Sequence, residues 1–71
     1  MPIPKMHPVE SSAVASIGYD AKAEAVYVEY LGGGLYAYRG VPPGVFVELT
    51  NADSKGTFVN AVIKRYPFRK L

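Results

Sequence analysis

The sequence predicts an α+β fold in which a three-stranded antiparallel β-meander is followed by two C-terminal helices packed on one face of the sheet. Three observations lead to this prediction. Residues of high β propensity fill the first half of the chain, three consecutive glycines divide two expected strands, and apolar residues recur at helical spacing after residue 42. With 71 residues, of which 49% are hydrophobic, the chain can fill one small core.

The strands are expected at residues 12–19, 25–30 and 35–39. The second is the clearest, because it consists of β-branched and aromatic residues with few exceptions. Asp20 is a natural turn residue after the first strand. The glycine run at 32–34 suits a hairpin, where φ must become positive.

The N-terminal residues are expected to form an extended arm over positions 1–8, ahead of a single domain at 9–71. Three prolines in this stretch remove backbone donors and favour extended shapes in the residues that precede them. A regular element is therefore not expected there.

A first helix is expected to open at Pro42 and Pro43, because the first helical turn needs no amide donors. Asn51 is a suitable stop. The apolar residues of this expected helix, Val45, Phe46 and Leu49, recur at i, i+1 and i+4.

A second helix is expected to be capped by Asp53 or Ser54 and to run to about Arg65. Pro67 ends it, since the residue before a proline is pushed out of the α region. One narrow arc of this helix carries the apolar residues Phe58, Val59, Val62, Ile63 and Tyr66.

Composition excludes several classes of function. The chain has no cysteine, so a disulfide framework and a thiolate metal site are impossible, and a cytoplasmic location is the default expectation. No apolar run approaches the roughly 18 residues of a membrane span. The acids are scattered and His7 is the only histidine, so we expect no metal, no cofactor and no enzyme activity.

Charge is strongly segregated along the chain. Residues 54–71 contain five basic side chains and no acid, whereas residues 1–53 contain three bases and all six acids. A basic end on a small domain suggests phosphate contacts and therefore nucleic acid, although solvated helix ends can look similar. The predicted nucleic-acid-binding cations are Lys55, Lys64, Arg65, Arg69 and Lys70.

Tyr36 and Tyr38 are two residues apart and share a face of their strand. Tyr27 or Tyr30 joins them, depending on the hairpin register. On an open face, the rings would form a stacking platform for unpaired bases. A three-residue loop with a glycine bulge would instead place them beside Val26 and Val28, against the helices, as part of the core.

The start of the second helix has the ingredients of a phosphate seat. Ser54 and Thr57 supply hydroxyls, Lys55 an ammonium group, and Gly56 space for a close approach. The spacing is not that of a nucleotide-binding P-loop. The same residues also suit an ordinary helix cap with tight packing at the glycine.

The order of these features resembles the KTSC domain family. The resemblance rests on Ser11-Ser12, Ile17-Gly18-Tyr19-Asp20, Val26-Tyr27-Val28-Glu29-Tyr30, Tyr36-Ala37-Tyr38, Val41-Pro42, Leu49, Ala52, Ser54, Gly56, Phe58, Asn60, Ile63 and Tyr66. It covers nearly everything from residue 9 to residue 68. The resemblance implies a small α+β module, found alone in bacterial and phage proteins and at the C-terminus of some lysyl-tRNA synthetases. The family's activity is not established, and RNA binding has been suggested for it.

Two hypotheses of function follow. The first is a small non-catalytic module that binds RNA or another single-stranded nucleic acid through the basic C-terminal end. The second is a protein-interaction or self-association module that uses an unprotected sheet edge, for which the first strand is a candidate because residues 11–19 carry no charge.

Overall fold

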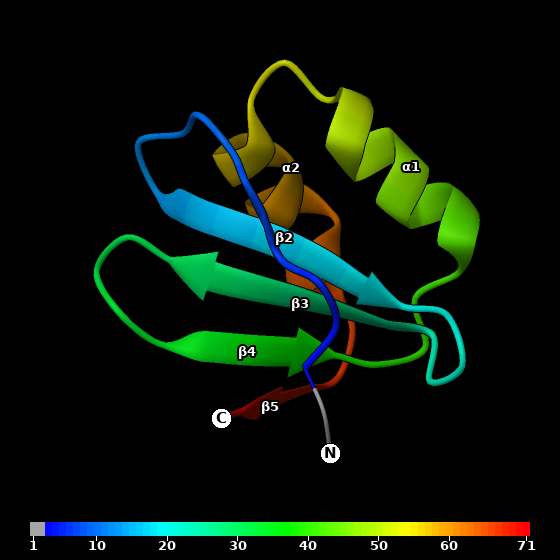
Figure 1. Cartoon of the computed structure of the whole chain (residues 1–71). Helices are drawn as coiled ribbons and strands as arrows, with labels where there is room; N and C mark the ends of the chain where they lie inside the picture. Colours follow the sequence, from blue (N-terminus) through cyan, green and yellow to red (C-terminus); the bar gives the residue numbers. More distant parts are fainter. Residues whose placement is uncertain (1–2) are drawn as a thin grey trace.

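The computed structural model describes residues 3–71 and contains an antiparallel sheet, two α-helices and a short 3₁₀ helix (Figure 1). The elements in chain order are β1 (His7–Pro8), β2 (Val14–Asp20), β3 (Ala25–Tyr30), β4 (Leu35–Tyr38), α1 (Pro43–Asn51), α2 (Lys55–Ala61), η1 (Ile63–Arg65) and β5 (Phe68–Lys70). The predicted α+β class, antiparallel sheet and two helices are confirmed. None of the helices among the described residues is long and apolar enough to cross a membrane.

The sheet has five strands in the order β1-β2-β3-β4-β5, so the prediction of a three-stranded meander was wrong. Both additional strands come from segments that were expected to lie outside the sheet. Residues 7 and 8 of the predicted arm pair with β2, where the missing donor of Pro8 is tolerated because the strand is an edge. Met1 and Pro2, also part of that predicted arm, lie outside the described residues.

The fifth strand forms because the chain turns back after the second helix. Pro67 blocks further helix, and its carbonyl oxygen accepts a hydrogen bond of 2.8 Å from the amide of Arg39. Residues 68–70 then run antiparallel to β4. The C-terminal residues 68–70 therefore form the edge strand β5.

The predicted second helix is divided. Its N-cap is Ser54, whose hydroxyl accepts a hydrogen bond from the Thr57 amide, but the α-helix ends at Ala61 and continues as the 3₁₀ helix η1. Val62 has φ −119° and ψ −55°, outside the ideal helical values. Two adjacent β-branched residues, Val62 and Ile63, lower helix propensity at this point.

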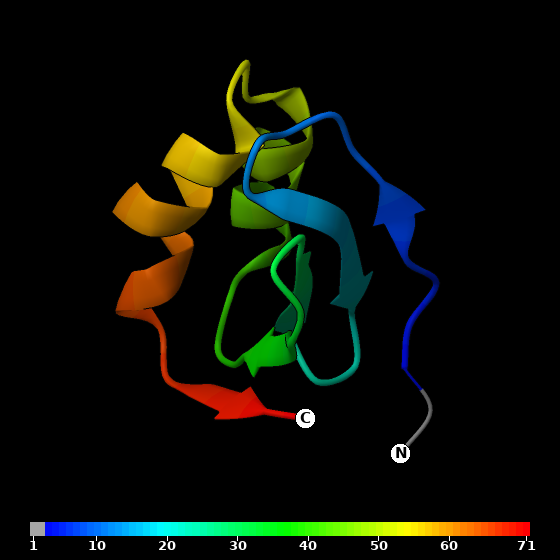
Figure 2. The same ribbon diagram turned by 90° about the vertical axis from the view of Figure 1, so that its left-hand side faces the viewer.

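One hydrophobic cluster joins the sheet to the helices. It contains Val26 and Val28 from β3 together with Leu49 from α1, Val59 from α2 and Ile63 from η1, each at most 1% exposed. In Figure 2, α2 and the N-terminal segment lie on opposite sides of strands β2–β4, and α1 lies at the top, over one end of the strands. Burial of these side chains is the main stabilising contribution.

A second, smaller cluster lies on the opposite face of the sheet. Tyr27 is buried there with Ala25 and Ala37, and Met6 from the N-terminal segment packs against them. Gly18 is the point of closest approach, since a Cβ atom at this position would lie 2.7 Å from the Met6 sulfur and 2.8 Å from the Lys5 carbonyl oxygen. The missing side chain at Gly18 in β2 therefore allows the N-terminal segment to pack on this face of the sheet.

We predict that Gly18→Val destabilises the fold by about 1–3 kcal/mol and loosens the N-terminal strand, because the new side chain overlaps backbone atoms. Urea unfolding measures the stability. Hydrogen exchange of the Val9 amide, which donates to the Ala15 carbonyl oxygen at 3.1 Å, reports on the strand. Gly44→Ala in α1 is the matched control, because nothing lies within 4 Å of its added Cβ atom. Equal stability of the Gly18→Val variant and the parent chain would contradict the prediction.

Candidate nucleic-acid interface

The hairpin register decides where the tyrosines point. Tyr36 is paired with Val28 and Tyr38 with Val26, so both rings share the helix-facing side of the sheet with these valines. Tyr38 is 3% exposed and belongs to the core, whereas Tyr36 is half-buried at its margin. Tyr30 joins them on this side. An open platform on the other face is therefore not formed by this pair.

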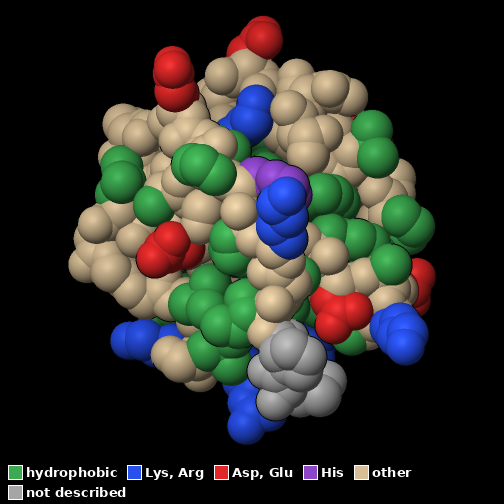
Figure 3. Space-filling model, in the orientation of Figure 1, with side chains coloured by type: hydrophobic (Ala, Val, Ile, Leu, Met, Phe, Trp, Pro, Cys, Tyr) green, Lys and Arg blue, Asp and Glu red, His purple; other side chains and the backbone are tan. Residues whose placement is uncertain are grey.

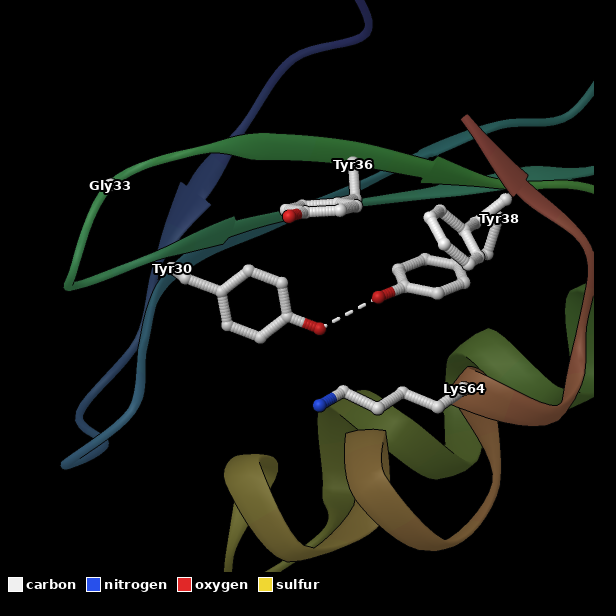
Figure 4. A pocket seen from close by; sticks show the side chains of 6 residues that line it. Tyr30, Gly33, Tyr36, Tyr38 and Lys64 are labelled. Atoms are coloured by element: carbon white, nitrogen blue, oxygen red, sulfur yellow. Dashed lines mark hydrogen bonds between the residues drawn. The ribbon is translucent and has the colours of Figure 1, made fainter. Parts of the chain in front are cut away.

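A pocket of about 430 Å³ lies between the tyrosine-bearing face of β3 and β4 and the C-terminal part of the chain (Figure 4). Its lining residues are Tyr30, Gly33, Tyr36, Tyr38, Lys64 and Phe68. Three tyrosines, a phenylalanine and one cation thus surround a space whose size is within the range of small-ligand sites.

The aromatic rings of the pocket contact one another. Tyr30 meets Tyr36 edge to face at a centroid distance of 5.4 Å, and Tyr36 stacks with Tyr38 at 6.3 Å. Phe68 lies 5.7 Å from the Tyr36 ring and 5.9 Å from the Tyr38 ring. Because Phe68 is 58% exposed while Tyr38 is buried, Phe68 offers the accessible ring surface.

Two tyrosine hydroxyls meet inside the pocket. The hydroxyl oxygens of Tyr30 and Tyr38 are 2.8 Å apart and hydrogen-bonded (Figure 4). Burial, followed by this hydrogen bond, raises the pKa of Tyr30 well above the ordinary value of 10.0. The Tyr30 hydroxyl therefore stays protonated at neutral pH and can act as a donor or an acceptor.

Two predicted cations flank the aromatic rings. The Nζ atom of Lys64 lies 5.7 Å from the centroid of the Tyr30 ring, and Nζ of Lys70 lies 5.9 Å from that of Tyr36. Both distances are within cation–π range. In Figure 4 the Lys64 side chain extends from the helical segment toward the tyrosines.

The β5 register separates the two basic residues of that strand. Lys70 is paired with Tyr36 and shares its face, whereas Arg69 is paired with Ala37, which faces the other side of the sheet. The structure therefore does not gather all five predicted cations around the pocket. Figure 3 shows Lys and Arg side chains along the lower edge of the molecule, where Figure 1 places β5.

The other predicted cations have different surroundings. Lys55 lies at the start of α2, where its Nζ atom donates a 2.6 Å hydrogen bond to the Ala52 carbonyl oxygen. Arg65 is exposed at the end of η1, next to Lys64 in sequence. Lys64 and Lys70 are thus the cations with contacts to the pocket rings.

The residues of the predicted phosphate seat form a helix cap. The Ser54 hydroxyl oxygen accepts from the Thr57 amide at 3.2 Å and lies 2.9 Å from the Thr57 hydroxyl. A Cβ atom at Gly56 would lie 3.4 Å from both Ala13 and Ser11 side-chain atoms, so the glycine allows the loop before β2 to pack against α2. Phosphate binding at this position stays a prediction.

Sequence reasoning did not select Phe68, and it left Tyr30 and Tyr27 as alternatives. The alternation Phe68-Arg69-Lys70 after Pro67 is typical of a strand. A stretch of three residues is too short for this pattern to distinguish a strand from an irregular C-terminal end. Among residues 3–71 there is no group of three His, Asp or Glu side chains that could hold a metal ion.

The KTSC domain family matches residues 10–68 of this chain. A protein from Tsukamurella paurometabola is 46% identical over 83% of this chain and 88% of its own length, and an uncharacterised protein from Stutzerimonas stutzeri is 41% identical over 86% of each. A lysine–tRNA ligase from Nostoc punctiforme is 36% identical over 87% of this chain, which spans 11% of the ligase.

The crystal structure of a KTSC domain protein from Yersinia pestis has the same fold. Its TM-score is 0.91 at 37% identity, over 94% of this chain and 96% of that one. The chain is a member of the KTSC domain family.

We predict that the free energy of unfolding falls as pH rises above about 10, and that it falls less steeply in Tyr30→Phe. The folded-state pKa of Tyr30 is raised, so above pH 10 the unfolded state releases a proton that the folded state keeps, and stability is lost. Urea unfolding at several alkaline pH values measures the slope. Tyr66→Phe is the control substitution, and identical slopes for Tyr30→Phe and the parent chain would refute the assignment.

Proposed function

We propose that this KTSC domain binds single-stranded nucleic acid, in particular RNA, at the pocket between the β3–β4 hairpin, η1 and β5. The observation that carries the proposal is the placement of Lys64 and Lys70 beside a cluster of aromatic rings that includes exposed Phe68. Aromatic rings and cations at one site match a ligand that alternates flat bases with phosphates.

The energetics favour single strands over duplexes. Stacking of one unpaired base on an aromatic side chain contributes about 1–3 kcal/mol, whereas paired bases are stacked on one another and are not available. Lys64 and Lys70 supply the phosphate contacts. At about 0.7 per contact, two contacts correspond to a slope of about −1.4 in a plot of log affinity against log salt.

The similarity to part of a lysine–tRNA ligase supports RNA as the ligand. That protein is named for a reaction on transfer RNA, and the matching segment is 11% of its length. A small accessory module would add affinity for RNA without taking part in the reaction.

We propose a non-catalytic role. Tyr30, whose pKa is raised, is a weak nucleophile and a weak general base at neutral pH. His7, the only histidine, lies in β1 on the edge strand far along the sheet from β4 and β5. The pocket therefore has the groups needed to hold a ligand but lacks an activated nucleophile.

Protein interaction is the second candidate, supported by the exposed apolar side chains of Phe68 and Leu71, which are 58% and 55% accessible. The edge on which this idea first rested is occupied, because β1 pairs with β2. The edge strand β5 carries Arg69 and Lys70, and like charges disfavour pairing with a second copy. Sedimentation at several concentrations tests this candidate, and a strict monomer counts against self-association.

We predict that Lys70→Glu weakens binding to a fluorescein-labelled oligouridylate about five- to tenfold, because it replaces a phosphate contact by repulsion. Fluorescence anisotropy over about 50–200 mM salt measures affinity and slope. The slope should become shallower by about 0.7 in the variant.

Arg69→Glu is the matched control for this experiment. It makes the same change of charge on the neighbouring residue of the same strand, but on the opposite face of the sheet. At about 150 mM salt, where the screening length is about 8 Å, Arg69→Glu should weaken binding much less than Lys70→Glu does. Equal losses in the two variants would mean that the pocket face is not the binding surface, and no binding of RNA at low salt would remove the proposed function.

A further inference from the structure

We propose that the pocket takes one nucleotide of the strand, with its base stacked on Phe68 and its edge hydrogen-bonded to the paired hydroxyls of Tyr30 and Tyr38. This inference rests on the proposed function and specifies the ligand unit. In this proposal the domain recognises the base of one nucleotide in addition to binding phosphates.

The size and shape of the site set the ligand unit. A volume of about 430 Å³ is near the lower end of the range for small-molecule sites, which suits one nucleotide and not a run of stacked bases. The tyrosine rings are already packed against one another at 5.4 and 6.3 Å, so a base cannot enter between them. Phe68 is the exposed ring of the set and is the surface on which a base can stack.

The hydroxyl pair provides hydrogen bonds to the base edge. Two hydroxyls have two protons, and the bond of 2.8 Å between Tyr30 and Tyr38 uses only one of them. Whichever hydroxyl donates, the other keeps its own proton, and unused acceptor lone pairs remain. Because both residues line the pocket, a bound base meets one available donor and at least one acceptor.

The positive charge around the pocket favours a negatively charged ligand. Lys64 lines the pocket and Lys70 stands beside Tyr36, so aromatic rings that would otherwise attract a quaternary ammonium group are flanked by two positive charges. A cationic ligand is repelled. A nucleotide phosphate placed near Lys64 is attracted.

The test uses the full chain and the four ribonucleoside 5′-monophosphates, with ribose 5-phosphate as the probe that lacks a base. In an NMR titration, the nucleotides should shift the ring signals of Phe68, Tyr36 and Tyr30. Ribose 5-phosphate should shift the side-chain signals of Lys64 and leave the ring signals unchanged. The four nucleotides should differ in affinity by about two- to tenfold, the range expected for a neutral hydrogen bond.

Two variants separate stacking from base reading. Phe68→Ala, at an exposed position of an edge strand, should weaken all four nucleotides about equally. Tyr30→Phe keeps the ring and removes one of the two paired hydroxyls, so a base meets the Tyr38 hydroxyl alone. The differences in affinity among the nucleotides should therefore change, while the binding of ribose 5-phosphate should not. Tyr66→Phe, whose ring does not line the pocket, is the control.

The outcomes distinguish this inference from the function on which it rests. If the oligouridylate binds but the monophosphates do not compete, or if Phe68→Ala leaves their binding unchanged, the single-nucleotide site is refuted while nucleic-acid binding stands. Equal affinities of the four nucleotides for the parent chain refute base reading, and differences that are unchanged in Tyr30→Phe refute the role of the hydroxyl pair. If neither the oligonucleotide nor any monophosphate binds, the proposed function fails with it.

Discussion

The antiparallel pairing of β3, β4 and β5 sets which side chains of this protein meet. Side chains opposite one another in such pairs point to the same face. The pairing of Tyr36 with Val28 and with Lys70 therefore brings a ring, the core and a cation together. A shift of one residue in either pairing would turn these side chains to the other face of the sheet.

The two faces of the sheet are covered by different means. The helices contribute Leu49, Val59 and Ile63 to the larger cluster, whereas the other face is covered by the N-terminal segment over Gly18. The pocket lies where the large cluster ends and its tyrosines reach the surface.

Much of the fold was predictable from local pattern. The β3 strand was predicted at residues 25–30 and the Ser54 cap was one of two candidates, because β propensity, glycine runs and capping side chains act over a few residues. The strands β1 and β5 were missed because each has three residues or fewer and owes its conformation to a neighbour distant in sequence. Strand propensity has little meaning without that partner. The division of the second helix at Val62 was missed for a similar reason, since its apolar spacing is continuous.

The candidate site shows the same division between local and long-range information. Composition and alternation are properties of the local chain, so the sequence was enough to predict the available side chains. These include paired tyrosines on one strand face and a C-terminal end rich in lysine and arginine. The three-dimensional structure was needed to show that Lys64, Lys70 and Phe68 join those tyrosines while Arg69 faces away. The reason is physical: the position of the tail is set by backbone hydrogen bonds to β4, a strand some thirty residues earlier in the sequence, and no local pattern encodes that pairing.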